Sequence, residues 1–220
     1  MPFRPEGYDL FVFDCDGVIL DSNEIKSQAF FDVTLRFGQE TADRFVAYHK
    51  LHGGVSRQEK FKHFVAEILK LDPNDREPLA NELVEAYGQI CRDGLETCPM
   101  ISGVEAFLAG LPTKVRNYVV SGGAQSEVRR ALKERHLDPF FSLILGNPKS
   151  KKENMQYLFD SGSLVGRGAY FGDARLDMEL AEQFGLDFVF VSGASEWKEA
   201  EVEFHGQRIY DFRDLLESTP

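Results

Sequence analysis

Short apolar runs alternate with amphipathic segments along most of this chain. Each run has the length of a buried strand, and the segments between the runs repeat their apolar positions at helical spacing. This alternation favours a parallel sheet with helices on both faces, so we predict an α/β fold with a Rossmann-like, doubly wound core. The expected strands lie at residues 8–13, 117–120, 141–145, 169–171, 188–191 and 208–210.

The alternation is interrupted once, directly after the first expected strand. From residue 22 to residue 92 the chain shows helical spacing and no strand pattern. Phe61, Phe64 and Ile68 recur at the spacing of one helix face, and Ser56 precedes that helix as its expected cap. We therefore predict an all-helical insertion. The predicted domains are a core of residues 1–20 and 93–220 and a helical cap of residues 21–92.

The charge balance bears on the kind of partner. The 220 residues include 25 Lys and Arg against 36 Asp and Glu, which gives a net charge of −11. A chain this acidic is poorly suited to bind nucleic acid or an anionic membrane. A small phosphorylated metabolite is compatible with it, because a bound cation can reverse the field inside a cleft. A hydrophobic content of 43% excludes wholesale disorder.

Cysteine usage and apolar run length bear on the compartment. Cys15, Cys91 and Cys98 show no Cys-x-x-Cys spacing, which excludes a disulfide framework and disfavours a cysteine-rich zinc site. No apolar run approaches the ~20 residues of a membrane span, and the N-terminal run stops at Asp14. We expect a cytoplasmic protein without a signal peptide.

Polar residues follow four of the expected strands, at the point where each strand ends. Because the carboxyl ends of parallel strands meet at one edge of the sheet, we expect these side chains to converge there. Carboxylates suit Mg²⁺, and a hydroxyl, a lysine and backbone N–H groups suit the oxygens of a phosphate. The residues concerned are Asp14 and Asp16, then Ser121, then Lys149, Lys151 and Lys152, then Asp173 and Asp177.

Three of these strand ends also carry recognisable motifs, namely residues 14–19 (DCDGVI), 119–122 (VVSG) and 172–177 (GDARLD). In this order they resemble the first, second and fourth motifs of the haloacid dehalogenase-like hydrolase superfamily. The long helical insertion resembles the branch with a helical cap, which includes phosphoglycolate phosphatase-like and β-phosphoglucomutase-like proteins. The resemblance covers nearly the whole chain.

The resemblance implies a role for each acid. Asp14 would be the nucleophile and Asp16 the general acid and base. Asp14 and Asp173 would supply carboxylate ligands to Mg²⁺, and Asp16 would add its backbone carbonyl. Asp177 would act through a water molecule or through the active-site lysine.

The phosphate-binding residues are less evenly supported. Ser121 and Gly122 match the second motif and would hold phosphate oxygens. The family often places Lys-Pro after the third strand, and this chain departs from that pattern. We take Lys151 as the first candidate for the active-site lysine, Lys152 as the second and Lys149 as the third.

One segment of the cap also resembles a known one. Residues 53–57 (GGVSR) are similar to a stretch in the caps of β-phosphoglucomutase-like proteins that faces the active site. Arg57 would then make a bidentate contact with an anionic substrate. The alternative is a helix-start arginine in solvent. The five histidines show no metal-binding spacing, and we interpret Trp197 as a core residue.

Together these features predict a Mg²⁺-dependent phosphatase. It would hydrolyse a small phosphate monoester, such as a sugar phosphate or similar metabolite, through an aspartyl-phosphate. A phosphomutase would share every core residue. A haloacid dehalogenase is disfavoured, because the family's dehalogenases lack the second carboxylate that Asp16 provides. A catalytically idle phosphoryl- or Mg²⁺-binding module is the alternative from another class, but a phospho-receiver would carry an acid after the third strand, where this chain reads Leu-Gly-Asn.

Overall fold

A computed structural model describes residues 3–200 and 204–216. Between the first two strands five α-helices follow one another, and strands and helices then alternate up to the fifth strand. The strands are β1 (Leu10–Phe13), β2 (Arg116–Ala124), β3 (Leu143–Asn147), β4 (Gly168–Gly172), β5 (Asp187–Val191) and β6 (Gln207–Ile209). The α-helices are α1 (Asn23–Thr34), α2 (Gln39–Leu51), α3 (Arg57–His63), α4 (Pro73–Thr97), α5 (Val104–Gly110), α6 (Gln125–Glu134), α7 (Lys151–Asp160), α8 (Arg175–Gln183) and α10 (Arg213–Leu216).

The six strands form one parallel sheet in the order β3-β2-β1-β4-β5-β6. The chain runs outward from β1 to β3 and then returns to the other side of β1 with β4. The strand order therefore reverses between β1 and β4, and ligands of doubly wound sheets bind beyond the carboxyl ends of the strands at such a point. The predicted α/β class and parallel core are confirmed.

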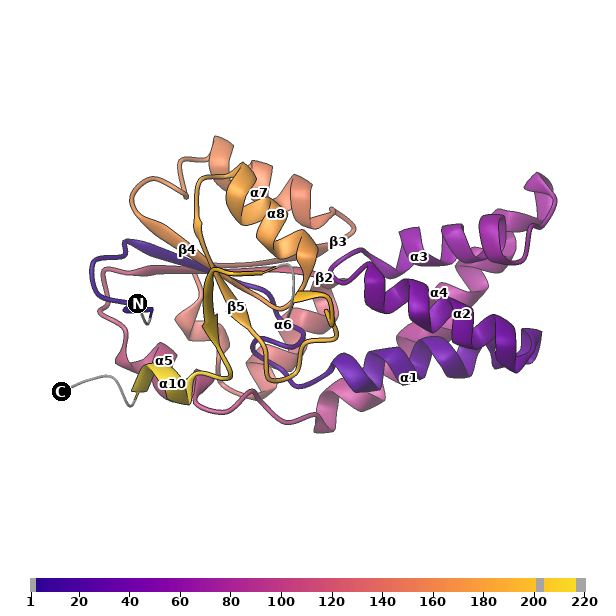
Figure 1. The fold of residues 1–220 in the computed structure, drawn as a ribbon, viewed down its shortest axis with the longest axis horizontal. Helices are drawn as coiled ribbons and strands as arrows, with labels where there is room; N and C mark the ends of the chain where they lie inside the picture. Colours follow the sequence, from indigo (N-terminus) through magenta and orange to yellow (C-terminus); the bar gives the residue numbers. More distant parts are fainter. Residues whose placement is uncertain (1–2, 201–203, 217–220) are drawn as a thin grey trace.

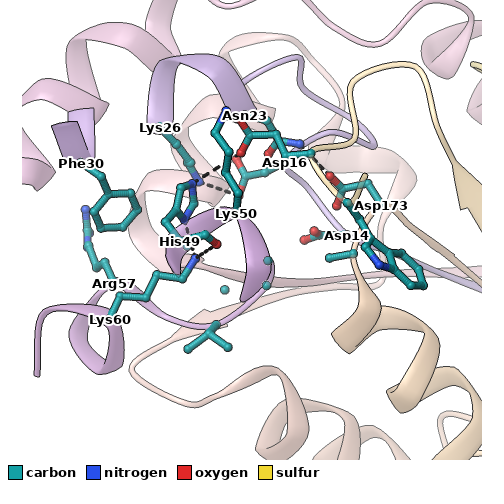
Figure 2. Close-up of a pocket in the computed structure, with 18 of the residues that line it drawn as sticks. Asp14, Asp16, Asn23, Lys26, Phe30, His49, Lys50, Arg57, Lys60 and Asp173 are labelled. Carbon is teal, nitrogen blue, oxygen red and sulfur yellow. Dashed lines mark hydrogen bonds and ion pairs between the residues drawn. The ribbon is translucent and has the colours of Figure 1, made fainter. Parts of the chain in front are cut away.

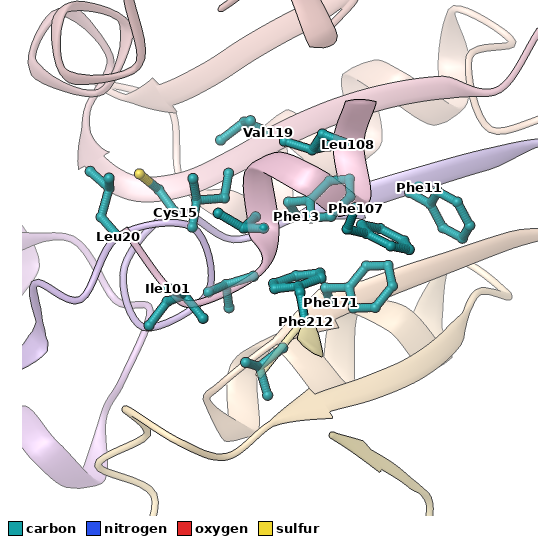
Figure 3. Close-up of a cluster of buried hydrophobic side chains, with 14 of the residues drawn as sticks. Phe11, Phe13, Cys15, Leu20, Ile101, Phe107, Leu108, Val119, Phe171 and Phe212 are labelled. Atoms are coloured by element: carbon teal, nitrogen blue, oxygen red, sulfur yellow. The ribbon is translucent and has the colours of Figure 1, made fainter. Parts of the chain in front are cut away.

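Both faces of the sheet are covered by helices, as the alternation predicted. Phe11 and Phe13 of β1 face α5, α6 and α10, and Figure 3 shows the aromatic cluster on this face, which includes Phe107 and Phe212. Leu10 and Val12, the alternate residues of β1, pack against α7 and α8 on the opposite face. Because β1 is apolar on both faces, it is buried at the centre of the sheet.

The insertion after β1 is a helical cap with a hydrophobic core of its own. Helices α1 to α4 extend to one side of the sheet in Figure 1 and bury residues such as Phe30, Phe45 and Phe61 among themselves. The chain enters the cap near Asp21 and leaves it near Pro99. Backbone hydrogen bonds join these two segments, among them one from Asp21 N–H to the Pro99 carbonyl. Helix α4 continues to Thr97.

The third strand differs from its prediction. It begins at Leu143 rather than at residue 141, because Asp138–Phe140 forms a 3₁₀ turn and Phe141 packs into the core beside it. Across the described ranges, every helix is too short or too polar to pass through a membrane.

Candidate active site

Two aspartates meet where the strand order reverses. Asp14 follows β1 directly, and its N–H donates to the Phe171 carbonyl of β4 at 2.9 Å. Asp173 lies just past the end of the same strand. The parallel register, which pairs Phe13 with Phe171, thus brings two carboxylates from distant segments of the chain to one point.

Lys151 links Asp14 to a second buried carboxylate. Its Nζ lies 2.8 Å from Asp14 Oδ2 and 2.6 Å from Asp177 Oδ1. Asp177 also accepts hydrogen bonds from the Tyr170 hydroxyl at 3.1 Å and from Ala174 N–H at 3.2 Å. Although burial alone would lower the pKa of Lys151, the two carboxylates hold it well above its ordinary value. This lysine is a permanent cation beneath Asp14.

The other two candidate lysines lie elsewhere. Lys149 is exposed, with its Nζ 5.4 Å from the centre of the Tyr157 ring, and Lys152 is exposed on α7. Lys151 is the first residue of α7, and a capping box between Ser150 and Glu153 fixes where that helix begins. This capping box therefore directs the Lys151 side chain into the protein, while the side chains of Lys149 and Lys152 lie at the surface.

The charges at this point fit a divalent cation. Oxygen atoms of Asp14, Asp173 and Asp177 lie within 4.8 Å of one another, and all three residues are buried. Lys151 offsets one of the three negative charges, so two are left over. Burial raises the pKa of Asp14 to about 7 and, aided by Asp14 and Asp177, raises the pKa of Asp173 well above its usual value. A doubly charged cation would relieve this imbalance.

Asp14 and Asp173 are the pair best placed as metal ligands, because Asp177 is already bonded to three donors. Asn23 of α1 donates to Asp173 Oδ2 at 2.6 Å and so orients that carboxylate. Gly17, with a φ of +73°, lies so close that a Cβ there would clash with Asp173. The absence of a side chain at Gly17 thus leaves space for the Asp173 carboxylate.

Asp16 faces the cap rather than Lys151. Its Oδ1 accepts a hydrogen bond from the Ser22 hydroxyl at 2.6 Å, and its Oδ2 lies 2.5 Å from Lys26 Nζ. Burial alone would raise the pKa of Asp16, but Lys26 and Ser22 outweigh burial and hold it below its ordinary value. In this arrangement Asp16 is an ionised carboxylate.

The cap meets the core over the site through two glycines. A Cβ on Gly122 would clash with the Gly54 carbonyl oxygen, and a Cβ on Gly54 would lie 3.2 Å from Lys151 Nζ. The turn before α3 therefore reaches the carboxyl end of β2 backbone to backbone. Ser121 lies directly below, fully buried, with its Oγ accepting the Gly123 N–H at 3.0 Å.

A pocket lies between cap and core, lined from the core by Asp14, Asp16, Gly122 and Asp173. Arg57 lines its cap side, as Figure 2 shows. Ser121, Lys151 and Asp177 do not line it and lie behind its wall.

Arg57 is bound to the core rather than free. As predicted, Ser56 caps α3 through Glu59 N–H, so Arg57 begins the helix. Its Nη2 lies 2.8 Å from Glu127 Oε1 of α6, and both side chains are about nine-tenths buried. The carboxylate of Glu127 thus holds the place that we expected for an anion of the substrate.

Several residues of the pocket escaped the sequence reasoning. Lys26, His49 and Lys60 line its cap side, and Glu196 approaches from the loop after β5. Their positions in the chain form no motif, and the five histidines show no metal-binding spacing. Trp197 lines the pocket while also packing against Phe190, 5.6 Å between ring centroids.

Comparison with known proteins agrees with this geometry. The family model for haloacid dehalogenase-like hydrolases matches residues 11–191, and the chain belongs to that family. The prediction of a hydrolase is confirmed at this level. A search of curated proteins found no match.

Solved structures support the fold. A predicted phosphatase from Clostridium acetobutylicum superposes with a TM-score of 0.74 at 19% identity, covering 96% of this chain and 97% of that one. A predicted phosphoglycolate phosphatase from Haemophilus somnus gives 0.73 at 17%, covering 97% and 98%. YfnB of Bacillus subtilis, described as a HAD-hydrolase bound to magnesium, gives 0.67 at 18%, covering 96% and 98%.

Proposed function

We propose that the protein is a Mg²⁺-dependent phosphatase that hydrolyses a small phosphate monoester through an aspartyl-phosphate on Asp14. The observation that supports this most is the excess of negative charge where the strand order reverses between β1 and β4. Asp14, Asp173 and Asp177 are buried with a single lysine, and the pocket above them is open to the cap. Such a site is suited to a cation and a phosphoryl group together.

Asp14 is the nucleophile of the proposed reaction. One of its oxygens forms a bond to phosphorus while the bond from phosphorus to the alcohol oxygen breaks. Cys15 N–H donates to Asp14 Oδ1 at 2.6 Å and Lys151 contacts Oδ2, so the carboxylate is held in a fixed orientation. Gly122 lines the pocket at the carboxyl end of β2, and its N–H group would assist in holding phosphate oxygens.

Mg²⁺ would be held by the Asp14 and Asp173 carboxylates, with the backbone carbonyl of Asp16 as the further predicted ligand. When bound, the ion neutralises the phosphate and the attacking carboxylate, which otherwise repel each other. Asn23 keeps Asp173 directed at this point, and Asp177 keeps Lys151 charged.

Asp16 moves the protons. As an ionised carboxylate it is ready to accept a proton from the water that hydrolyses the aspartyl-phosphate. Protonation of the leaving alcohol requires Asp16 to gain a proton first, and Lys26 and Ser22 oppose that in this arrangement. The acid half of the cycle therefore requires Asp16 to leave Lys26, which belongs to the cap.

Phosphate release tests the proposal directly. The purified protein is assayed with sugar phosphates, phosphoglycolate, nucleotides and an aryl phosphate, with Mg²⁺ and with a chelator. Release that depends on Mg²⁺ and disappears in Asp14→Asn supports it. Isomerised sugar phosphate without release would instead indicate a phosphomutase, and binding without either reaction an idle module.

A further inference from the structure

The cap side of the pocket carries four cations, and one of them lacks a counter-ion. Three have a carboxylate within ion-pair distance. Among the described residues, Lys60 has none within 4.0 Å. Its Nζ makes hydrogen bonds to His49 alone, through Nδ1 at 2.6 Å and the carbonyl oxygen at 3.4 Å, and lies 5.5 Å from the centre of the Phe30 ring. The paired cations are Lys26 with Asp16 at 2.5 Å, Lys50 with Glu196 at 2.9 Å and Arg57 with Glu127 at 2.8 Å.

Lys60 is nevertheless almost fully buried, with 2% of its surface exposed. A buried ammonium without an opposite charge is costly, so such groups are ordinarily paired. Burial, together with repulsion from Lys26 and Lys151, lowers the pKa of Lys60 to about 7, and the more distant Glu196 and Asp16 offset this only in part. Within residues 3–200 and 204–216, no carboxylate forms an ion pair with this lysine.

His49 adds a second unsatisfied donor at the same place. Burial and the neighbouring lysines lower the pKa of His49 well below its ordinary value, so the ring is neutral. Because Nδ1 faces the donor Lys60, we assign the ring proton to Nε2. That atom is buried and has no hydrogen-bond partner among the described side chains, the nearest carboxylate being Glu196 at 3.6 Å.

The positions of these two donors favour a bound ligand, rather than another residue of the fold, as the group that satisfies them. Both residues line the pocket, and Figure 2 shows Lys60 and His49 side by side on its cap side. Arg57, the residue that sequence favoured for an anion, is already neutralised by Glu127. A negative charge entering the pocket would therefore be stabilised most at Lys60, which has no carboxylate within 4.0 Å among the described residues.

We infer that Lys60 and His49 form an anion subsite that binds a second negatively charged group of the substrate. This rests on the proposed function, in which the first anionic group is the phosphate at Asp14. The substrate class is then a phosphate monoester that also carries a carboxylate or a second phosphate. The two sources share the chemistry that Lys60 recognises, a compact anion that accepts two hydrogen bonds.

Binding of non-hydrolysable phosphonates tests the inference without any turnover. Alkylphosphonates of increasing chain length, ending in a carboxylate, a second phosphonate or a neutral hydroxyl, are titrated calorimetrically in the presence of Mg²⁺. We expect the wild-type protein to bind an anionic member at least about tenfold more tightly than its hydroxyl counterpart, the value of one charge-assisted hydrogen bond. The chain length and end group with the largest ratio identify the natural spacing and anion.

Lys60→Met and Lys62→Met are the matched variants. Lys62 lies on the same helix, is exposed and pairs with Glu59. We expect the ratio to fall to about one in Lys60→Met and to be retained in Lys62→Met. The ratio compares two ligands on one protein, so a general loss of affinity does not alter it. Lys60→Gln, which keeps a hydrogen-bond donor but no charge, gives an intermediate ratio and serves if Lys60→Met does not fold.

Two results overturn the inference. One is a wild-type protein with no preference for the anionic phosphonates. The other is a preference that persists in Lys60→Met, and its loss in Arg57→Ala would then place the subsite at Arg57. Failure of the proposed function has a different signature, namely a preference that depends on Lys60 in a protein that releases no phosphate.

Discussion

Two buried lysines, one in the core and one in the cap, show opposite ways of arranging charge. Lys151 has no exposed side-chain surface and lies against two carboxylates at 2.8 and 2.6 Å. Lys60 is equally buried, but its contacts among the described residues are uncharged, namely hydrogen bonds to the neutral His49 and the face of the Phe30 ring. The pKa of the first is well above its ordinary value because of its partners, and burial lowers that of the second to about 7. The core neutralises its own lysine, whereas we propose that the lysine of the cap is neutralised by a ligand.

The imbalance on the two sides has opposite sign. The core side leaves two negative charges uncompensated at Asp14, Asp173 and Asp177, and the cap side leaves one positive charge at Lys60. A ligand pair made of a divalent cation and a molecule with two anionic ends would correct both. The comparison thus describes the proposed substrate from its two ends.

The largest effect is expected at the core end. Asp14→Asn should bring phosphate release below detection, because an amide is a poor nucleophile and a weak metal ligand. Labelled phosphate should no longer become attached to the protein. Turnover by highly purified Asp14→Asn protein would contradict the assignment of the nucleophile.

Asp16→Asn should reduce kcat by about 10²-fold or more, the range for loss of a general acid or base. Its side chain touches Ser22 and Lys26 rather than the other acids, so the affinity for Mg²⁺ should stay close to that of the wild type. Mg²⁺ titrations of activity and of binding measure the two separately. A changed Mg²⁺ affinity at unchanged kcat would make Asp16 a ligand instead.

Lys151→Met should destabilise the folded protein by about 3–5 kcal/mol, since it leaves two buried carboxylates without their cation. Urea unfolding followed by circular dichroism measures the free energy. Added Mg²⁺ should recover part of the loss. A variant as stable as the wild type in the absence of Mg²⁺ would mean that Lys151 is not what balances Asp14 and Asp177.

Lys60→Met should do the reverse and stabilise the protein. The lysine has a pKa of about 7 when folded and an ordinary value of 10.5, so between these values the unfolded state binds more protons and wild-type stability rises with pH. The destabilisation of the wild-type protein by the buried charge of Lys60 is greatest below the folded pKa. We expect a gain of roughly 2–4 kcal/mol at neutral pH, shrinking as the pH approaches the ordinary value. Unfolding curves at neutral pH and near the ordinary pKa measure the change in free energy. A Lys60→Met variant that is less stable than the wild type at neutral pH would contradict an uncompensated charge at Lys60.

The smallest effect is expected two residues along the same helix. Lys62 and Glu59 are 2.7 Å apart but largely exposed, and exposed pairs of this kind contribute at most about 1 kcal/mol. Lys62→Met should therefore barely move the unfolding midpoint. A shift as large as that of Lys60→Met would show that charge alone, and not burial, sets the difference between the two lysines.

Sequence reasoning reached the fold and the core acids because both follow from local pattern. Period and run length define the strands, and an acid that follows a buried parallel strand must lie at the ligand edge. Asp14 and Asp173 were accessible in this way. The site roles of these residues stay predictions until they are measured.

The cap side was not accessible for a physical reason. Lys60 precedes the apolar residue Phe61 in an ordinary helix, and nothing local marks it as buried. Its burial comes from α1 and α2, through Phe30 and His49, which lie 30 and 11 residues away in the chain. Likewise, Arg57 looks available until α6 folds against the cap with Glu127. Such pairings are set by tertiary packing.

The central position of β1 also bears on how the chain comes to be folded during synthesis. Its neighbours, β2 and β4, begin only at Arg116 and Gly168, whereas α1 to α4 end at Thr97. During synthesis, all four cap helices therefore leave the ribosome before either strand that pairs with β1. Contacts close in sequence form quickly and distant parallel pairings slowly. The apolar segment Leu10–Phe13 then waits unpaired beside a finished cap, and this interval is when the nascent protein is most exposed to aggregation.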